Sequence, residues 1–205
     1  MMAGPDQVVA VILAGGEARR MGGGDKVLMP IGDKPLLYHV LARLTPQCDN
    51  ILLNANGDPA RFKSFGLPVI PDSVTGQLGP LAGILSGMDA AAINYPTSSH
   101  MLSLAGDTPF IPVDLLARMM RLSHGQNIVR ACSGGRAHPV FALWPLTVRA
   151  DLRDQLINHD IRKIDRFTAS YDVVDCVFDG IPDPFFNINH PEDRIEAERS
   201  LKQEK

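Results

Sequence analysis

The chain has 205 residues, 45% of them apolar and 21% charged, with a formal net charge of -3. This length is enough to bury a core and favours a single domain, whereas the near-balanced charge argues against a nucleic-acid partner, which would need a basic face. The three cysteines form no C-x-x-C pair and the six histidines show no H-E-x-x-H spacing, so no zinc ribbon, redox dithiol or zinc-protease site is indicated.

The first element is the apolar run VVAVIL at 8–13, which predicts a parallel strand buried on both faces. The longest apolar run, 8–14, is far shorter than the ~20 residues that a membrane span needs. It follows an aspartate rather than a basic segment, and no secretory cleavage pattern is convincing. We therefore expect a cytoplasmic protein without a membrane partner.

Further along the chain, short apolar runs alternate with segments whose apolar residues have helical spacing. The other predicted strands cover 50–53, 67–70, 101–105, 127–131, 140–143 and 173–178. The predicted helices cover 35–45, 81–93, 113–122 and 191–201. This alternation predicts an α/β protein with a Rossmann-like three-layer α/β/α fold and a mainly parallel central sheet. Ligands of such sheets bind at the carboxyl ends of the strands, which here follow Leu13, Leu53 and Ala105.

The segment 13–26, LAGGEARRMGGGDK, joins the first strand to the next helix and is rich in glycine and cations. Glycine lets the backbone approach a ligand closely, and successive N–H groups then bind an anion. A triphosphate needs this combination of close amides and fixed positive charge. The spacing matches neither G-x-x-x-x-G-K-[ST] nor G-x-G-x-x-G, so we predict a phosphate loop of another kind, the alternative being a flexible turn with solvated cations. The residues concerned are Gly15, Gly16, Arg19, Arg20, Gly22, Gly23, Gly24 and Lys26.

Asp107 directly follows the predicted strand 101–105, in the segment GDTPFIP. Magnesium prefers hard oxygen ligands and often takes only one or two protein carboxylates beside water and phosphate. A single aspartate at a strand end is therefore a sufficient Mg²⁺ ligand. The alternative is that Asp107 forms the turn before Thr108-Pro109.

The motifs LAGG, RMGG and DK, with KPL shortly after them at 34–36, resemble the N-terminal signature of the molybdenum cofactor guanylyltransferases, the MobA family, and their spacing matches that signature without a gap. GDTPFIP is similar to the magnesium-binding element of that family. The resemblance implies a fold of the nucleotidyltransferase type and makes Arg20, Lys26 and Asp107 the catalytic residues, with Asp107 holding Mg²⁺. It also implies one domain, 1–205, whose nucleotide-binding half ends near 110 and whose acceptor-binding half covers about 111–205.

The resemblance implies that the glycine-rich loop binds GTP, with Leu13, Ala14 and Gly15 at the guanine end. Arg20 and Lys26 would reach the phosphates, and Gly16 and Gly22 would belong to the same nucleotide site. Two residues that follow strands, Asn54 and Asp72, match nucleotide-contacting positions, although an Asn-Gly turn and a solvated carboxylate are the plainer interpretations. The motif GPLAG resembles the loop near guanine and ribose, and it contributes Gly79, Pro80, Leu81 and Gly83, although it is also consistent with a tight helix entry.

Near the end of the chain, Asn187 and Asn189 resemble the N-x-N element of the family, which lies near the metal and the second substrate. In an extended segment the two side chains share one face, although Asn189 could instead cap the helix that begins at Pro191. Arg136 and the pair His138-Pro139 match a family segment for which we expect contact with the pterin substrate.

The resemblance implies transfer of GMP from GTP to the terminal phosphate of molybdopterin, free or loaded with molybdenum, with release of pyrophosphate. Its further partners would be molybdenum-insertion proteins and molybdoenzyme chaperones, and we expect a monomer. Three alternatives stay open: a molybdopterin cytidylyltransferase, which typically has LAAG in place of LAGG; a sugar-phosphate nucleotidylyltransferase; and a nucleotide-binding module that only carries the cofactor.

Overall fold

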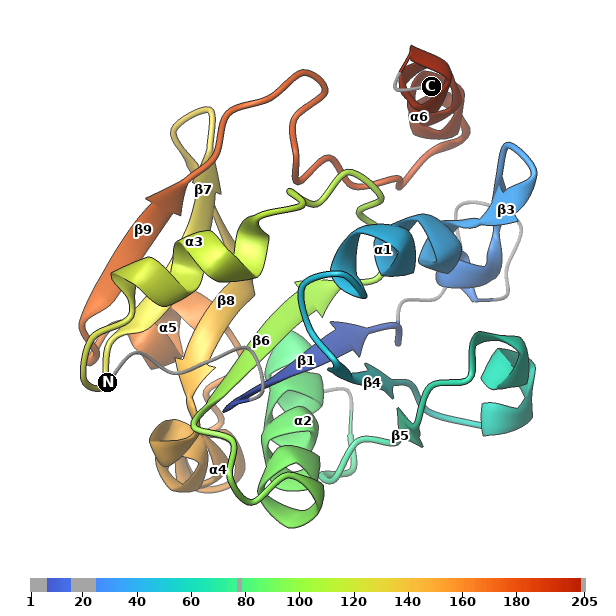
Figure 1. Ribbon diagram of the computed structural model, residues 1–205. Coiled ribbons are helices and arrows are strands. Elements are labelled where there is room, and N and C mark those ends of the chain that lie inside the picture. The colour runs from blue at the N-terminus through green and yellow to red at the C-terminus, as the bar shows by residue number, and fades with distance from the viewer. Residues whose placement is uncertain (1–6, 16–24, 77–78, 204–205) are drawn as a thin grey trace.

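The structure is a computed structural model that describes residues 7–15, 25–76 and 79–203. Seven strands form one sheet in the order β5-β4-β1-β6-β8-β7-β9, and two short strands, β2 and β3, pair with each other (Figure 1). The strands are β1 (Val8–Leu13), β2 (Pro30–Ile31), β3 (Lys34–Pro35), β4 (Asn50–Asn54), β5 (Val69–Ile70), β6 (His100–Ala105), β7 (Ile128–Ser133), β8 (Arg136–Pro145) and β9 (Val173–Val177). The α-helices are α1 (Leu36–Leu44), α2 (Pro80–Asn94), α3 (Leu115–Leu122), α4 (Arg149–Asn158), α5 (Ile164–Thr168) and α6 (Pro191–Gln203).

Four of these strands, β5, β4, β1 and β6, run parallel to one another. The first five residues of β1 are completely buried, which is the double-sided burial that its unbroken apolar sequence predicts. Because the strands are parallel and connected through helices, their carboxyl ends lie along one edge of the sheet. This edge is called the carboxyl edge below.

The other three strands depart from a purely parallel arrangement. Strand β8 lies between β6 and β7 and is antiparallel to both, whereas β9 is parallel to β7. A hairpin connects β7 to β8 through Gly134 and Gly135, whose φ angles are +54° and +73°. Two consecutive residues with positive φ form the tight turn that suits the twist of paired strands, and glycine adopts it without strain. The hairpin tip therefore projects at the carboxyl edge, beyond the end of β6.

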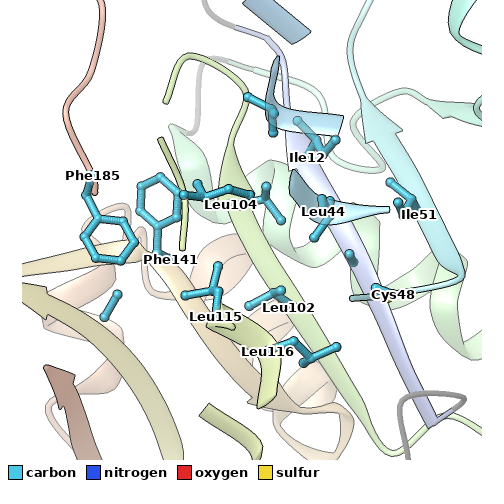
Figure 2. Close-up of a cluster of buried hydrophobic side chains, with 14 of the residues drawn as sticks. Ile12, Leu44, Cys48, Ile51, Leu102, Leu104, Leu115, Leu116, Phe141 and Phe185 are labelled. Carbon is cyan, nitrogen blue, oxygen red and sulfur yellow. The ribbon is translucent and has the colours of Figure 1, made fainter. Parts of the chain in front are cut away.

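Helices cover both faces of the sheet, which gives the predicted three layers. On one face α1 and α3 pack over a core cluster that includes Ile12, Leu104 and Leu115 (Figures 1 and 2). On the other face α2, α4 and α5 enclose a second cluster, which includes Leu85 and Trp144. The mainly parallel α/β fold expected from the sequence is thus confirmed. None of the helices in the described part of the chain is both long and apolar enough to cross a membrane.

Two helices were not predicted from the sequence. The sequence of α4 is dominated by polar residues and has little apolar periodicity, because only Leu152 and Leu156 of this helix are buried against the core. The five-residue helix α5 is too short to show a period. Helices α1, α2, α3 and α6 appear where they were predicted, with ends that differ by two residues at most.

Candidate active site

The chain leaves three neighbouring strands at the carboxyl edge, and backbone hydrogen bonds hold the exits together. The N–H of Ala14, after β1, donates to the carbonyl of Asn54 at the end of β4 (2.9 Å). The N–H of Gly106, after β6, donates to the carbonyl of Leu13 (3.0 Å). Side chains that directly follow these strands are thereby brought to one place.

The first group at this edge centres on Lys26, whose side chain is buried. Its Nζ donates to Oδ2 of Asp107 and to Oδ1 of Asn189, both at 2.6 Å. Lys26 follows β1, Asp107 follows β6, and Asn189 comes from the segment before α6, so the contact joins distant parts of the sequence. These three residues are called the Lys26 cluster.

Gly106 makes the approach of Lys26 possible. A Cβ atom at this position would lie 2.7 Å from Cγ1 of Val27 and 3.1 Å from Cγ2 of Ile12, which is closer than real side chains pack. The absence of a side chain lets the single 3₁₀ turn Lys26–Leu28 sit against the end of β6. The ammonium group can then reach Asp107.

Asn187 also faces the end of β6. Its Oδ1 accepts a hydrogen bond from the buried hydroxyl of Thr108 (2.5 Å). Between the two asparagines, the buried Ile188 donates its N–H to the carbonyl of Asp107 (3.1 Å). Asn187 and Asn189 thus both bind residues beside the end of β6, which agrees with the shared face that alternation predicts.

The cap of α6 is provided by Asp193 rather than by the Asn189 side chain. Oδ2 of Asp193 accepts the backbone N–H groups of Asn189 (2.7 Å) and His190 (2.8 Å). A carboxylate in the first turn that binds the N–H groups before the helix is a usual form of capping. The amide of Asn189 is therefore available to Lys26.

A second group lies across β1 from the first. Nδ2 of Asn54 donates to Oδ1 of Asp72 (3.0 Å), and Nδ2 of Asn56 donates to Oδ2 of the same carboxylate (2.8 Å). Oδ1 of Asn54 would lie only 2.3 Å from a Cβ at Gly83, and Cδ2 of Leu13 only 2.9 Å from it. Asn54, Asp72 and Gly83 thus pack around one point at the start of α2.

The remaining residues of GPLAG form the beginning of α2. Gly79 has a φ of +70° and precedes the helix, and Pro80 occupies its first turn, where the missing N–H costs no hydrogen bond. Leu81 is fully buried, so its side chain belongs to the core rather than to a ligand surface. Leu13 joins the two groups: its side chain faces Gly83 and its carbonyl binds Gly106.

Several predicted site residues lie outside the described part of the chain, namely Gly16, Arg20 and Gly22, together with Arg19, Gly23 and Gly24. The described ends of that loop, Gly15 and Asp25, lie at the carboxyl edge. Asp25 binds the guanidinium of Arg61 through Oδ2 (2.6 Å), and this fixes the residue before Lys26.

A third group forms at the tip of the β7–β8 hairpin. Nε2 of His138 lies 2.7 Å from Oγ of Ser133, and the same hydroxyl lies 2.8 Å from Oδ1 of Asp183. The imidazole packs on Phe185, with 4.8 Å between ring centroids. Burial lowers the pKa of His138, an effect that the Asp183 carboxylate opposes and the Arg136 guanidinium reinforces.

Sequence reasoning did not single out Thr108, Ser133 or Asp183. Thr108 sits beside Asp107 at a strand end and could have been found by that position. Gly134-Gly135 between two apolar runs is a hairpin signal that would have located Ser133. Asp183 has no local signal, because its partner Ser133 lies 50 residues away in the sequence.

Asp107 and Asn189 of the Lys26 cluster carry oxygen atoms of the kind that a divalent cation binds. A carboxylate oxygen and an amide oxygen lie at equal distances from one positive charge, and both are hard ligands of the type that Mg²⁺ prefers. No group of three or more His, Cys, Asp or Glu side chains that could hold a metal exists among the described residues. A cation here would therefore need ligands from the substrate phosphates as well.

Residues 10–173 match the MobA-like NTP transferase domain family. A molybdenum cofactor guanylyltransferase from Rhodopseudomonas palustris (strain BisB5) is 55% identical over 193 residues, which cover 93% of this chain and 92% of the relative. One from Bradyrhizobium sp. (strain ORS 278) is 52% identical over 195 residues, covering 94% and 92%. The chain belongs to the MobA-like NTP transferase family. As a member of this family, the chain is a nucleotidyltransferase.

Solved structures extend the fold to other MobA-like and related proteins. Molybdopterin-guanine dinucleotide biosynthesis protein A from Archaeoglobus fulgidus has a TM-score of 0.74 and 23% identity, covering 95% of this chain and 98% of its own. A 4-diphosphocytidyl-2C-methyl-D-erythritol synthase from Anaerococcus prevotii also has a TM-score of 0.74, with 14% identity and 97% of both chains covered. Since proteins with different substrates share the MobA-like fold, the fold alone does not decide the nucleotide.

Proposed function

We propose that the chain transfers GMP from GTP to the terminal phosphate of molybdopterin, free or loaded with molybdenum, and releases pyrophosphate. The observation that carries this proposal is the Lys26 cluster at the end of the glycine-rich loop. It stands in a chain that is more than half identical to proteins named molybdenum cofactor guanylyltransferase. The function rests on this site and not on the fold.

The proposed reaction is an in-line displacement at phosphorus. An oxygen of the acceptor phosphate forms a bond to the α-phosphorus of GTP, and the bond from that phosphorus to the bridging oxygen breaks. Pyrophosphate leaves with the electron pair. The acceptor phosphate is already ionised near neutral pH, its second pKa being about 6, so no general base is needed. Catalysis then consists of positioning and charge neutralisation.

Lys26 supplies positive charge for the α-phosphate and the departing pyrophosphate in this proposal. Its ammonium is fixed by two oxygens at 2.6 Å, so little reorganisation is needed. Arg20, from the loop outside the described residues, is proposed to act with it. Asp107, with Asn189 beside it, would hold Mg²⁺, which when bound neutralises phosphate charge. Asn187 is proposed to orient the acceptor from the same segment.

GTP is proposed to lie between the Lys26 cluster and the start of α2. Leu13 and Ala14 would lie at its guanine end, and Gly15, continuing through Gly16 and Gly22, would follow the phosphates with backbone N–H groups. The hydrogen-bonded pair Asn54 and Asp72 would face its nucleoside end. The absence of a side chain at Gly83 leaves room for the Asn54 amide, and Gly79 would allow close approach of the nucleotide. Pro80 and Leu81 would support this surface by fixing the first turn of α2.

The LAGG and GPLAG motifs favour GTP over CTP, and a direct assay tests this choice. The chain would be incubated with molybdopterin and each NTP in turn, in the presence of Mg²⁺, while pyrophosphate release is followed. We expect release with GTP only. Release with CTP alone would identify a cytidylyltransferase, and release with a sugar phosphate in place of molybdopterin would identify a sugar-phosphate nucleotidylyltransferase.

Thermal stabilisation, measured together with pyrophosphate release, separates an enzyme from a carrier module. A ligand present at a hundred times its Kd stabilises the folded state by about 2.7 kcal/mol, so GTP with Mg²⁺ should raise the Tm while CTP should not. Stabilisation by GTP without pyrophosphate release in the presence of molybdopterin would contradict catalysis and support a carrier.

We propose that this chemistry takes place in the cytoplasm. All three cysteines, Cys48, Cys132 and Cys176, are free and buried, which suits a reducing compartment. Burial raises the pKa of the Cys48 and Cys176 thiols, which makes both poor nucleophiles.

A further inference from the structure

The hydrogen-bond partners of Ser133 determine where the proton of His138 lies. The Ser133 hydroxyl is buried between two groups: both carboxylate oxygens of Asp183, at 2.8 and 3.0 Å, and Nε2 of His138, at 2.7 Å. An ionised carboxylate can only accept hydrogen bonds, and a hydroxyl has one proton to donate. The Ser133 proton is therefore directed at Asp183, and Nε2 of His138 must donate its own proton to Oγ of Ser133.

The other ring nitrogen, Nδ1, then carries a lone pair. Burial lowers the pKa of His138, with Arg136 acting in the same direction and Asp183 against it, which keeps the ring neutral near pH 7. Among the described residues no group hydrogen-bonds to Nδ1, and the atom is not enclosed by protein. The ring thus offers a hydrogen-bond acceptor that the described residues do not use.

Two aromatic rings of the core pack against the imidazole. The centroid of the imidazole lies 4.8 Å from that of Phe185 and 6.5 Å from that of Phe141, and both phenylalanines are buried. Asp183 also accepts the backbone N–H of Phe185 (2.8 Å), so the same carboxylate holds both the serine and the ring that packs on the imidazole. The imidazole is thereby held in one orientation, and a ligand with an N–H donor matches its Nδ1 acceptor.

The group lies on the acceptor side of the sheet. The β7–β8 hairpin is separated by β6 from β1 and β4, which carry the proposed nucleotide residues. Phe185 precedes Asn187 by two residues, which in an extended chain span about 7 Å. A heterocycle beside His138 would therefore lie within a short molecule's length of the Lys26 cluster.

We propose that His138 accepts, through Nδ1, a hydrogen bond from an N–H group on the planar heterocycle of the second substrate, and that Ser133 and Asp183 are positioning residues that fix the required tautomer. This inference rests on the proposed function for the identity of that substrate, the pterin of molybdopterin. It assigns to Ser133 and Asp183 a role in recognition of the acceptor and none in GTP binding.

The first test is steady-state kinetics of Ser133→Ala with GTP, molybdopterin and Mg²⁺. The KM for molybdopterin should rise severalfold, because only the fraction of His138 in the accepting tautomer binds the ligand, while kcat and the KM for GTP stay unchanged. Ser133→Thr, which keeps the hydroxyl, should have the wild-type KM for molybdopterin. The matched control is Ser123→Ala, because Oγ of Ser123 lies 3.0 Å from Nε2 of His100 and His100 begins β6 at the opposite edge. This control should change neither KM.

The second test reads the tautomer directly. ¹⁵N NMR of the histidine-labelled wild-type protein should find His138 protonated on Nε2, and Ser133→Ala should give a mixture of tautomers. Protonation on Nδ1 in the wild type, or an unchanged KM for molybdopterin in Ser133→Ala, would overturn the inference. Failure of the wild type to release pyrophosphate with any nucleotide would instead contradict the proposed function, and the assigned ligand with it.

Discussion

The two parts of the sheet build the candidate site in different ways. In the parallel part, β5, β4, β1 and β6, polar residues stand directly after buried strands and arrive at the carboxyl edge through strand geometry alone. In the part formed by β8, β7 and β9, the side chains come from a hairpin tip and from the irregular segment before α6. The first part gives a rigid frame, and the second adds residues by long-range contacts. Lys26 joins the two, since it binds Asp107 on one side and Asn189 on the other.

The largest expected effect comes from the parallel part. Asp107→Ala should lower kcat by at least a hundredfold, because loss of one electrostatic contact to a transition state commonly costs about 3 kcal/mol. The circular dichroism spectrum should stay unchanged, since the Asp107 side chain lies outside the core clusters. Asp175→Ala on β9, which removes an ion pair with Arg130 on β7 (2.9 Å), serves as the control. If Asp107→Ala turned over at the wild-type rate, Asp107 could not be the Mg²⁺ ligand that catalysis needs.

The next effect tests the irregular segment. Asn189→Ala should lower kcat about tenfold by releasing the Lys26 ammonium, with little change in Tm because Asp193 caps α6. If Asn189 instead acted as the cap, its loss would destabilise the protein by about 1 kcal/mol and leave kcat unchanged. Measurement of kcat and Tm on the same variant distinguishes these outcomes. Asn158→Ala, on the surface of α4, is the control.

Substitutions at two glycines of α2, Gly83 and Gly87, distinguish an effect on core packing from an effect on GTP binding. Gly83→Ala would place Cβ 2.3 Å from Oδ1 of Asn54, and Gly87→Ala would place it 2.6 Å from Cγ2 of Val11. Overpacking of this kind costs about 1–3 kcal/mol, enough to offset the roughly 1 kcal/mol that alanine gains in a helix. Both variants should therefore have a lower Tm, but only Gly83→Ala should raise the KM for GTP, by several-fold. Equal KM values would exclude a nucleotide contact at Gly83.

The smallest effect concerns pH. Burial lowers the pKa of His100, so in the folded state this ring stays neutral below the pH at which it is protonated in the unfolded chain, near 6.5. Between these two pKa values the unfolded state binds more protons, and stability must fall as pH falls through 6.5. His100→Gln should flatten the decrease in the free energy of unfolding between pH 7.5 and 5.5, measured by urea denaturation. If His100→Gln left the pH dependence of the free energy of unfolding unchanged, His100 would not be its cause.

The sequence predicted most of the fold and the edge of the sheet at which several proposed site residues lie. The residues that follow apolar runs, such as Asn54 and Asp107, could be located because strand ends in parallel sheets lie together. Lys26 could be proposed as a phosphate ligand, but its buried contact with Asn189 spans 163 residues and no local pattern encodes it. Ser133 and Asp183 are ordinary polar residues in the sequence. Their hydrogen bond becomes visible only in the structure, where the β7–β8 hairpin contacts the segment before α6.

The last helix has a consequence for proteolysis and truncation. Glu198 on α6 accepts the backbone N–H of Gly32 between β2 and β3, and Asp193 on the same helix holds the N–H of Asn189. Cleavage after residue 190 would therefore remove both of these contacts together with α6. The severed protein would keep its sheet yet lose the anchor that aligns Asn189, so a clipped preparation could look well folded and still be a poor enzyme.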